Sequence, residues 1–235
     1  MSCALLALAA DGRREAWNPL SVSLFYDCAD PAERAEGIAA AVDSVKRGEL
    51  VVLPTDTVYG IGADAFQPVA VDALLATKGR GRDLPVPVFV GSWDGLEGLV
   101  MVVAPTARDL VEAFWPGGLT LVVEHAPTLA WDVGDSRGTV AVRMPLHPVA
   151  LEVLAQTGPM AVSGANRAGE PPPRTAEEAQ EQLGYPVAVY LDGGPSGDPV
   201  PSTIVDVTGE VPRLLRLGAV SLQELREVVP DVQER

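Results

Sequence analysis

The amino-acid sequence predicts an α/β fold built on one mixed sheet. Short apolar segments typical of buried strands occur along most of the chain, and helical segments lie between them without strict alternation. In the last third, strand-like segments follow one another closely, which favours antiparallel pairs beside parallel ones. Hydrophobic residues make up 47% of the 235 residues, enough for a sizeable core. We therefore expect a mixed parallel/antiparallel sheet with flanking helices.

A boundary at about residue 30 separates an N-terminal extension from the rest of the chain. Residues 1–30 show no clear periodicity, and we interpret them as an N-terminal extension that is a candidate for disorder. Residues 31–235 are expected to form a single domain. This domain begins with a helix, since Asp30 is a suitable N-cap, Pro31 suits the first helical position and Gly48 suits the helix end.

The remaining elements follow from apolar runs bounded by glycine, proline and polar residues. Strands are expected at 50–53, 85–90, 119–125, 139–145, 159–166, 187–194, 202–209 and 212–218. Helices are expected at 69–79, 105–118, 147–158, 175–184 and 221–229. Ser221 and Glu224 predict a capping box at the start of the last helix. Between Pro54 and Gly60 we expect a loop.

Charge is distributed unevenly along this acidic chain. With 32 acidic and 17 basic residues the net charge is −15, which argues against stable nucleic-acid binding by a broad basic surface. Yet Lys78, Arg80 and Arg82 stand within five positions, and Lys78 is one of only two lysines beside 15 arginines. Such a cluster indicates a local site for a small anionic ligand such as phosphate. The alternative is a solvated basic loop.

Several common signatures are absent from the sequence. There is no G-x-x-x-x-G-K-[ST] loop, no G-x-G-x-x-G after a strand and no G-x-S-x-G elbow. Cys3 and Cys28 form neither a disulfide framework nor a metal-ligand spacing, so we expect no protein metal site and a reducing, cytoplasmic location. The apolar run over 3–10 lacks the preceding positive charge of a secretory signal, and no run approaches the roughly 20 residues of a membrane helix.

Polar side chains gather where the predicted strands end or begin. In α/β sheets ligands bind at strand ends, where loops carry the polar groups. Taken singly, these residues also suit turns and solvated ends, but together with the basic cluster they favour a ligand site. The residues are Thr55, Arg143, Ser163, Asn166, Ser202, Thr203 and Arg216.

Eight blocks of the sequence, in order, carry a family resemblance across about residues 35–225. They are "LPTDTVYGIGADAF", "KGRGRDLPVPV", "FWPGGLTLVV", "VAVRMPLHPVAL", "GPMAVSGANRAGE", "YLDGGPS", "STIVD" and "LLRLGAVS". The chain resembles the YrdC-like family, the L-threonylcarbamoyladenylate synthases, in the form without the extra C-terminal domain of longer members. The resemblance implies a twisted mixed sheet with helices around a large central cavity.

The resemblance also implies a reaction. L-threonine and bicarbonate would form a carbamate, which attacks the α-phosphate of ATP to give threonylcarbamoyl-AMP and pyrophosphate. Magnesium is expected with ATP. The product would pass to downstream tRNA threonylcarbamoyl-transfer proteins. The alternatives are a non-catalytic RNA-binding module, a nucleotide sensor that kept the pocket, and a carbamoyl-transfer maturation factor, for which the chain is too short and too poor in cysteine.

The family motifs imply roles for nine residues of this sequence. Lys78 and Arg80 match its K-x-R motif, which implies that they face the ATP phosphates and act in catalysis. The other residues implied on the ATP side are Arg82, Thr139, Asn166 and Arg216, and those on the L-threonine side are Thr55, Arg143 and Ser202. The chain departs from the family where Gly164 replaces the serine of the S-x-N motif.

Overall fold

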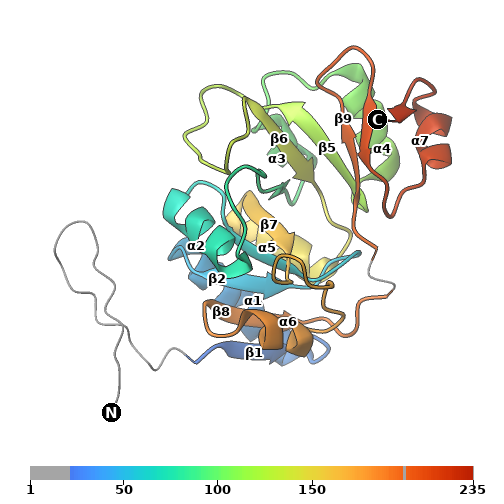
Figure 1. Ribbon diagram of the computed structural model, residues 1–235. Coiled ribbons are helices and arrows are strands. Elements are labelled where there is room, and N and C mark those ends of the chain that lie inside the picture. Colours follow the sequence, from blue (N-terminus) through green and yellow to red (C-terminus); the bar gives the residue numbers. More distant parts are fainter. Residues whose placement is uncertain (1–21, 198–199, 235) are drawn as a thin grey trace.

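The computed structural model describes residues 22–197 and 200–234, and its strands form one sheet (Figure 1). Along the sheet the order is β1-β8-β2-β3-β7-β4-β6-β5-β9-β10-β11. The strands are β1 (Leu24–Asp27), β2 (Leu50–Leu53), β3 (Gly60–Asp64), β4 (Val88–Phe89), β5 (Leu119–Glu124), β6 (Thr139–Arg143), β7 (Met160–Gly164), β8 (Val187–Asp192), β9 (Thr203–Asp206), β10 (Arg213–Arg216) and β11 (Gln233–Glu234).

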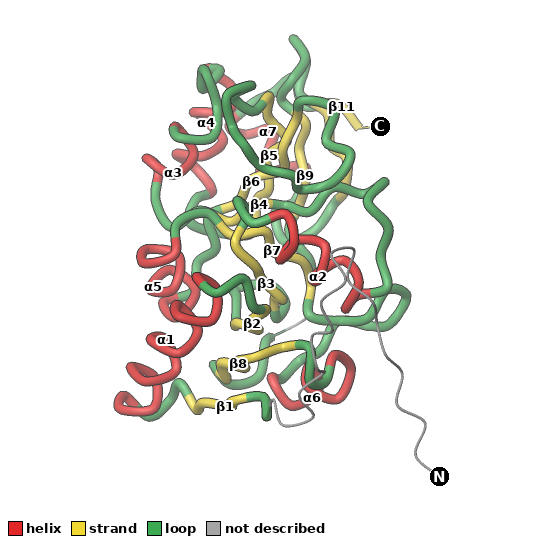
Figure 2. The backbone as a smooth tube through the Cα atoms, turned by 90° about the vertical axis from the view of Figure 1, so that its left-hand side faces the viewer, coloured by secondary structure: helices red, strands yellow, loops and turns green. Residues whose placement is uncertain are grey.

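Helices cover both faces of this sheet. They are α1 (Pro31–Lys46), α2 (Pro68–Lys78), α3 (Trp93–Glu97), α4 (Pro105–Phe114), α5 (Pro148–Thr157), α6 (Ala176–Leu183) and α7 (Leu222–Val228). Figure 2 shows α1 and α5 on one side of the strands and α2 and α6 on the other. Across the described ranges, no helix combines the length and the apolar composition needed to cross a membrane.

The sheet is mixed, as predicted. The pairs β1–β8, β8–β2, β4–β6, β5–β9 and β10–β11 are parallel, whereas β2–β3, β3–β7, β7–β4, β6–β5 and β9–β10 are antiparallel. The closely spaced strands of the last third, β9 and β10, form the antiparallel pair expected of them. The α/β fold class is therefore confirmed.

The two core layers follow from the alternation of side chains along a strand. In β2, Val51 and Leu53 pack with α1 and α5, whereas Leu50 and Val52 pack with α2 and α6 on the opposite face. All four residues are at most 2% exposed, so the continuous apolar run reflects burial on both faces.

Helix α1 begins and ends close to where the sequence predicts. The Asp30 carboxylate accepts hydrogen bonds from the N–H groups of Ala32 and Glu33, and Pro31 occupies the first turn. The capping box of α7 is also present, since Ser221 and Glu224 bond to each other's backbone. These local signals are read correctly because they depend on a few adjacent residues.

Four elements were not predicted: β1, β3, α3 and β11. Strand β1 lies within the predicted N-terminal extension and pairs with β8, while residues 1–21 lie outside the described residues. Strand β3 was missed because glycine is a poor strand former. A β-carbon at Gly60 would lie 2.8 Å from Val162 Cγ1, so glycine lets β3 approach the side chains of β7.

Gly37 allows α1 to pack closely against β1 and β8. A β-carbon there would lie 2.7 Å from Tyr26 Cβ and 2.9 Å from Leu191 Cδ2. We expect Gly37→Val to lower the free energy of unfolding by about 1–3 kcal/mol, because overpacking outweighs the gain in helix propensity. Chemical denaturation measures this effect, with Ala39→Val on the exposed face of α1 as the control. Equal stability of the two variants would contradict the close-packing argument.

Candidate functional site

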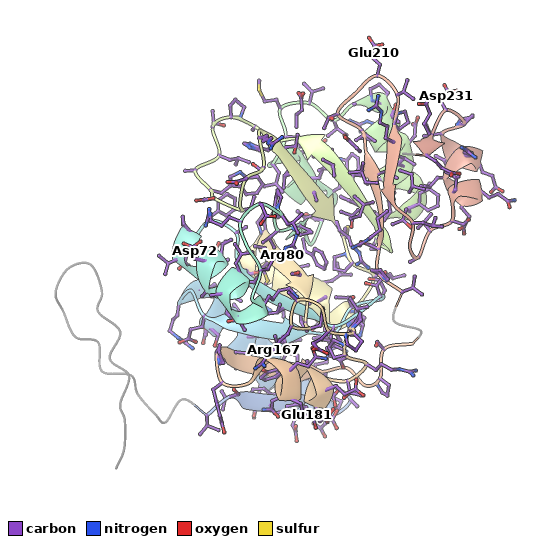
Figure 3. The ribbon with its side chains drawn as sticks, viewed as in Figure 1. Asp72, Arg80, Arg167, Glu181, Glu210 and Asp231 are labelled. Atoms are coloured by element: carbon purple, nitrogen blue, oxygen red, sulfur yellow. The ribbon has the colours of Figure 1, made fainter. Side chains whose placement is uncertain are left out.

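A cavity of about 780 Å³ lies at the middle of the sheet. Its walls come from the loop after β2, the end of α2, strands β5, β6, β7, β9 and β10, and the segment after β7. Figure 3 shows Arg80 toward the middle of the molecule, whereas Asp72, Glu181 and Glu210 lie at its periphery. The volume is in the range of sites that enclose a small-molecule ligand.

Eight of the nine residues to which the family motifs give roles line this cavity, as does Ser163, whereas Thr203 does not. The eight are Thr55, Lys78, Arg80, Thr139, Arg143, Asn166, Ser202 and Arg216. Arg82 does not line it. Its guanidinium instead forms ion pairs with Asp72 and Asp132, and its side chain is 38% exposed. The predicted contact of Arg82 with ATP remains a prediction.

Lys78 ends α2 and joins this helix to the segment after β7. Its ammonium donates hydrogen bonds to the backbone carbonyls of Gly164 and Asn166, the latter at 2.6 Å. Its own carbonyl accepts from the N–H of Ala168 at 2.8 Å. The side chain is buried, and burial, together with the nearby Arg80 charge, lowers the pKa of Lys78 to about 8. One of the three ammonium protons remains for a ligand.

Arg80 and Arg216 extend the positive charge across the cavity. Burial lowers the pKa of both, and the Arg80 charge further lowers that of Arg216. The buried Nε of Arg80 has no hydrogen-bond acceptor. Among the lining residues, four are cationic and only Glu170 is acidic. An anionic ligand would relieve both the mutual repulsion and the unmet hydrogen bond.

Ser202 is fixed by two neighbours at the start of β9. Arg216 donates to the Ser202 carbonyl from Nε at 3.0 Å and from Nη2 at 2.7 Å, and Nη2 also lies 3.1 Å from Ser202 Oγ. The Thr120 hydroxyl lies 2.7 Å from the same Oγ. Ser202 therefore connects Arg216 of β10 to Thr120 of β5.

Arg143 is the most enclosed of the cavity cations, with only 3% of its surface exposed. Its Nε donates to the Gly117 carbonyl at 2.9 Å, Nη1 to Thr57 Oγ1 at 2.8 Å and Nη2 to Asp56 Oδ1 at 2.7 Å. Burial lowers its pKa, while Asp56 opposes that shift. The guanidinium is thus held by several partners while it still borders the cavity.

Thr55 and Thr57 form a short hydrogen-bonded chain next to Arg143. Their hydroxyl oxygens are 3.1 Å apart, and Thr55 Oγ1 donates to the Val58 carbonyl at 2.7 Å. At the start of β6, Thr139 Oγ1 donates to the Ser136 carbonyl at 2.8 Å. The hydroxyl groups of all three residues are thus held by neighbouring groups in the wall of the cavity, which suits a site that positions its ligand.

Asn166 occupies the space above Gly164. Its amide nitrogen donates to the carbonyls of Arg167 and Glu170, both at 2.9 Å, and a β-carbon at Gly164 would lie 2.8 Å from its Oδ1. A serine at this position would therefore require the Asn166 side chain to move. The observed orientation of Asn166 thus depends on the glycine that stands at the position of the motif serine.

Asp56, Thr57 and Thr120 complete the polar network, although sequence reasoning did not select them. Thr120 interrupts the apolar run of β5, and this interruption was the available signal. Asp56 and Thr57 stand beside Thr55, but only the fold shows that they meet Arg143, 86 and more positions away. No group of three or more His, Cys, Asp or Glu side chains within the described ranges is arranged to hold a metal.

Comparison with known proteins places this cavity in a family. A family model described as "Telomere recombination", which covers the Sua5, YciO and YrdC proteins, matches residues 43–218. The chain belongs to the Sua5/YrdC family. A Mycobacterium tuberculosis (strain ATCC 25618 / H37Rv) protein, provisionally named a threonylcarbamoyl-AMP synthase, is 61% identical over 204 residues, covering 87% of this chain and 94% of the relative.

Other members of the Sua5/YrdC family are longer or more distant. The threonylcarbamoyl-AMP synthase of Bacillus subtilis (strain 168) is 38% identical, and the match covers 82% of this chain but 56% of that protein. The structure of Pyrococcus abyssi Sua5 complexed with L-threonine is similar with a TM-score of 0.84 and 33% identity, covering 91% of this chain and 62% of that one. E. coli YciO, with a TM-score of 0.77 and 22% identity over 88% of this chain and 100% of its own, supports the fold alone.

Proposed function

We propose that the protein is a threonylcarbamoyl-AMP synthase, which converts L-threonine, bicarbonate and ATP into threonylcarbamoyl-AMP and pyrophosphate. The observation that carries this proposal is the joint lining of one cavity by Lys78, Arg80, Arg216 and Arg143. The relatives named for this activity and the L-threonine complex of Sua5 support it.

The phosphate groups of ATP fit the wall formed by Lys78, Arg80 and Arg216. These three cations lie together, and both Arg80 and the third ammonium proton of Lys78 have hydrogen-bonding capacity left. Thr139 and Asn166 border the same space and supply polar contacts for the rest of the nucleotide. Charge-assisted hydrogen bonds to phosphate oxygens are the strong ones in such a site.

L-threonine fits the deeper wall at Arg143. A guanidinium is well suited to bind a carboxylate by two parallel hydrogen bonds. The hydroxyl groups of Thr55 and Ser202 line the same cavity and are held by neighbouring residues. We assign Arg143 to the substrate carboxylate and the Ser202 hydroxyl to a remaining polar atom of threonine. Thr55, whose hydroxyl is bonded to Val58 and Thr57, would contact the substrate as part of the cavity wall.

Catalysis in this proposal depends on placement and electrostatics, with no covalent enzyme intermediate. The amine of threonine and bicarbonate form a carbamate with loss of water. A carbamate oxygen attacks the α-phosphorus, and the bond from that phosphorus to the bridging oxygen breaks, so that pyrophosphate leaves with the electron pair. Lys78 and Arg80 stabilise the negative charge that develops on the leaving group.

The wider setting belongs to the same proposal. Mg²⁺ would accompany ATP on its phosphate oxygens, where it supplies further neutralisation of charge. The reaction would take place in the cytoplasm, and the product would pass to tRNA threonylcarbamoyl-transfer proteins. With a net charge of −15, we expect no stable complex between this chain and nucleic acid.

Pyrophosphate release with detection of the adenylate tests the proposed function. Purified protein is mixed with ATP, Mg²⁺, bicarbonate and L-threonine, and the products are followed by mass spectrometry. We expect pyrophosphate and threonylcarbamoyl-AMP in equal amounts, and neither in the absence of L-threonine. ATP binding without turnover would refute the synthase and would favour a nucleotide sensor that retains the pocket.

The low pKa of Lys78 predicts an alkaline fall in activity. Above a pH of about 8 the ammonium of the free enzyme loses its proton, so kcat/KM for ATP should decrease as the attraction for phosphate is lost. Between that pH and 10.5 the free energy of unfolding should instead rise with pH. In this range the unfolded chain binds more protons at Lys78 than the folded chain does. In Lys78→Arg the alkaline fall in kcat/KM should be absent, and the same fall in both proteins would refute the assignment.

A further inference from the structure

Asp56 is the charged partner of the buried Arg143. Its Oδ1 accepts hydrogen bonds from Arg143 Nη2 at 2.7 Å and from the Leu146 N–H at 2.8 Å. The Asp56 side chain is 16% exposed and that of Arg143 is 3% exposed. The other ion pairs found among the described residues join side chains that are 29–59% exposed, so this pair is the least accessible to water.

The hydrogen bonds of Arg143 restrict how its guanidinium can meet a ligand. A guanidinium has five N–H groups. One on Nε donates to Gly117, one on Nη1 to Thr57 and one on Nη2 to Asp56. One N–H on each terminal nitrogen therefore remains, which is the number that a bidentate contact with a carboxylate requires.

Asp56 holds this arrangement between two segments of the chain. It lies in the loop after β2, and Leu146 lies in the loop after β6, the strand that ends at Arg143. The carboxylate of Asp56 thus fixes Nη2 relative to both loops. Without it, the guanidinium would keep its partners on Nε and Nη1 but would lose the restraint on Nη2.

We propose that Asp56 is a positioning residue that orients Arg143 for the carboxylate of the amino-acid substrate, while the carboxylate of Asp56 itself makes no contact with that substrate. This inference rests on the proposed function, since it takes L-threonine as the ligand of Arg143. The role differs from simple neutralisation of a buried charge, and the two give opposite results on substitution.

Orientation and charge have opposite effects on binding of the substrate. Loss of orientation weakens the bidentate contact, whereas loss of the Asp56 charge leaves Arg143 more attractive to a carboxylate that contacts it directly. Asp56→Ala removes both the charge and the acceptor oxygen. Asp56→Asn removes the charge but keeps an oxygen that can accept from Arg143 Nη2 and from the Leu146 N–H.

Calorimetric titration of the whole chain with L-threonine, L-threoninol and ATP distinguishes these effects. Threoninol carries a hydroxymethyl group in place of the carboxylate, so it cannot form the bidentate contact. We expect Asp56→Ala to raise the Kd for L-threonine about tenfold or more and Asp56→Asn to raise it clearly less. The Kd values for L-threoninol and ATP should stay close to wild type in both variants. Asp109→Ala, exposed on α4, is the matched control.

Three results would overturn the proposal. A wild-type Kd for L-threonine in Asp56→Ala would show that orientation does not matter. Tighter binding in both Asp56 variants would show that the carboxylate only neutralises Arg143. Equal weakening for L-threonine, L-threoninol and ATP would indicate general damage to the cavity.

A second variant and a separate measurement of turnover keep the test conclusive. If Asp56→Ala does not fold, Asp56→Ser replaces it and is judged by the same criteria. The titrations are read without turnover, whereas failure of the proposed function would appear as wild-type protein that releases no threonine-dependent pyrophosphate. The two failures are therefore distinguishable.

Discussion

Replacement of Lys78 by alanine should lower kcat/KM for ATP by at least about a hundredfold, the effect typical of removing one preorganised electrostatic contact to a transition state. Two physical causes act together. The variant loses the cation assigned to the phosphates, and it also loses the two hydrogen bonds from the ammonium to the carbonyls of Gly164 and Asn166. Steady-state pyrophosphate release at varied ATP measures the change.

The loss of the two hydrogen bonds to Gly164 and Asn166 predicts an effect on stability besides the effect on activity. Because the ammonium ties α2 to the segment that carries Asn166, Lys78→Ala should also lower the free energy of unfolding, by about 1 kcal/mol, for the two half-buried carbonyl groups that lose this donor. Lys78→Arg keeps the charge but changes the geometry of the donors. We expect it to recover part of the ATP affinity.

The chain offers a close control for this experiment. Lys46 is the only other lysine in the sequence and lies exposed at the end of α1. Lys46→Ala should leave kcat/KM for ATP unchanged. If Lys78→Ala and Lys46→Ala had the same kinetic constants, the basic cluster would not be part of the ATP site.

Much of the fold was predictable because its signals are local. The cap at Asp30, the capping box at Ser221 and the apolar runs of β2 and β5 depend on short stretches of sequence. Strand β3 was not predictable in this way, because its glycines are explained only by the neighbouring strand β7. The position of β1 likewise depends on its pairing with β8.

The candidate site was predicted as a set of residues but not as a network. Sequence motifs selected Thr55 and Arg143, yet the partners that hold Arg143, namely Asp56, Thr57 and Gly117, come from two distant loops. Arg82 shows the opposite case, since its proximity to Lys78 in sequence does not bring it to the cavity wall. Spacing alone does not determine which side of a loop a side chain faces.

Arg143→Met should lower kcat/KM for L-threonine by at least about a hundredfold, because truncation of a buried, hydrogen-bonded charge removes the carboxylate contact. It should also lower the free energy of unfolding by about 1–3 kcal/mol, since Asp56, whose side chain is 16% exposed, loses its cationic partner and keeps the hydrogen bond from the Leu146 N–H. Kinetics at varied L-threonine and chemical denaturation measure the two effects separately.

A double variant separates the loss of binding from the loss of stability. In Arg143→Met/Asp56→Asn both charges are absent, and the asparagine oxygen still accepts from the Leu146 N–H. Because replacement of a whole buried ion pair by neutral groups is often close to neutral, part of the stability should return while the KM for L-threonine stays high. Recovery of threonine-dependent activity together with stability would mean that the single variant fails through misfolding alone, and Arg143 would then not be the partner of the substrate carboxylate.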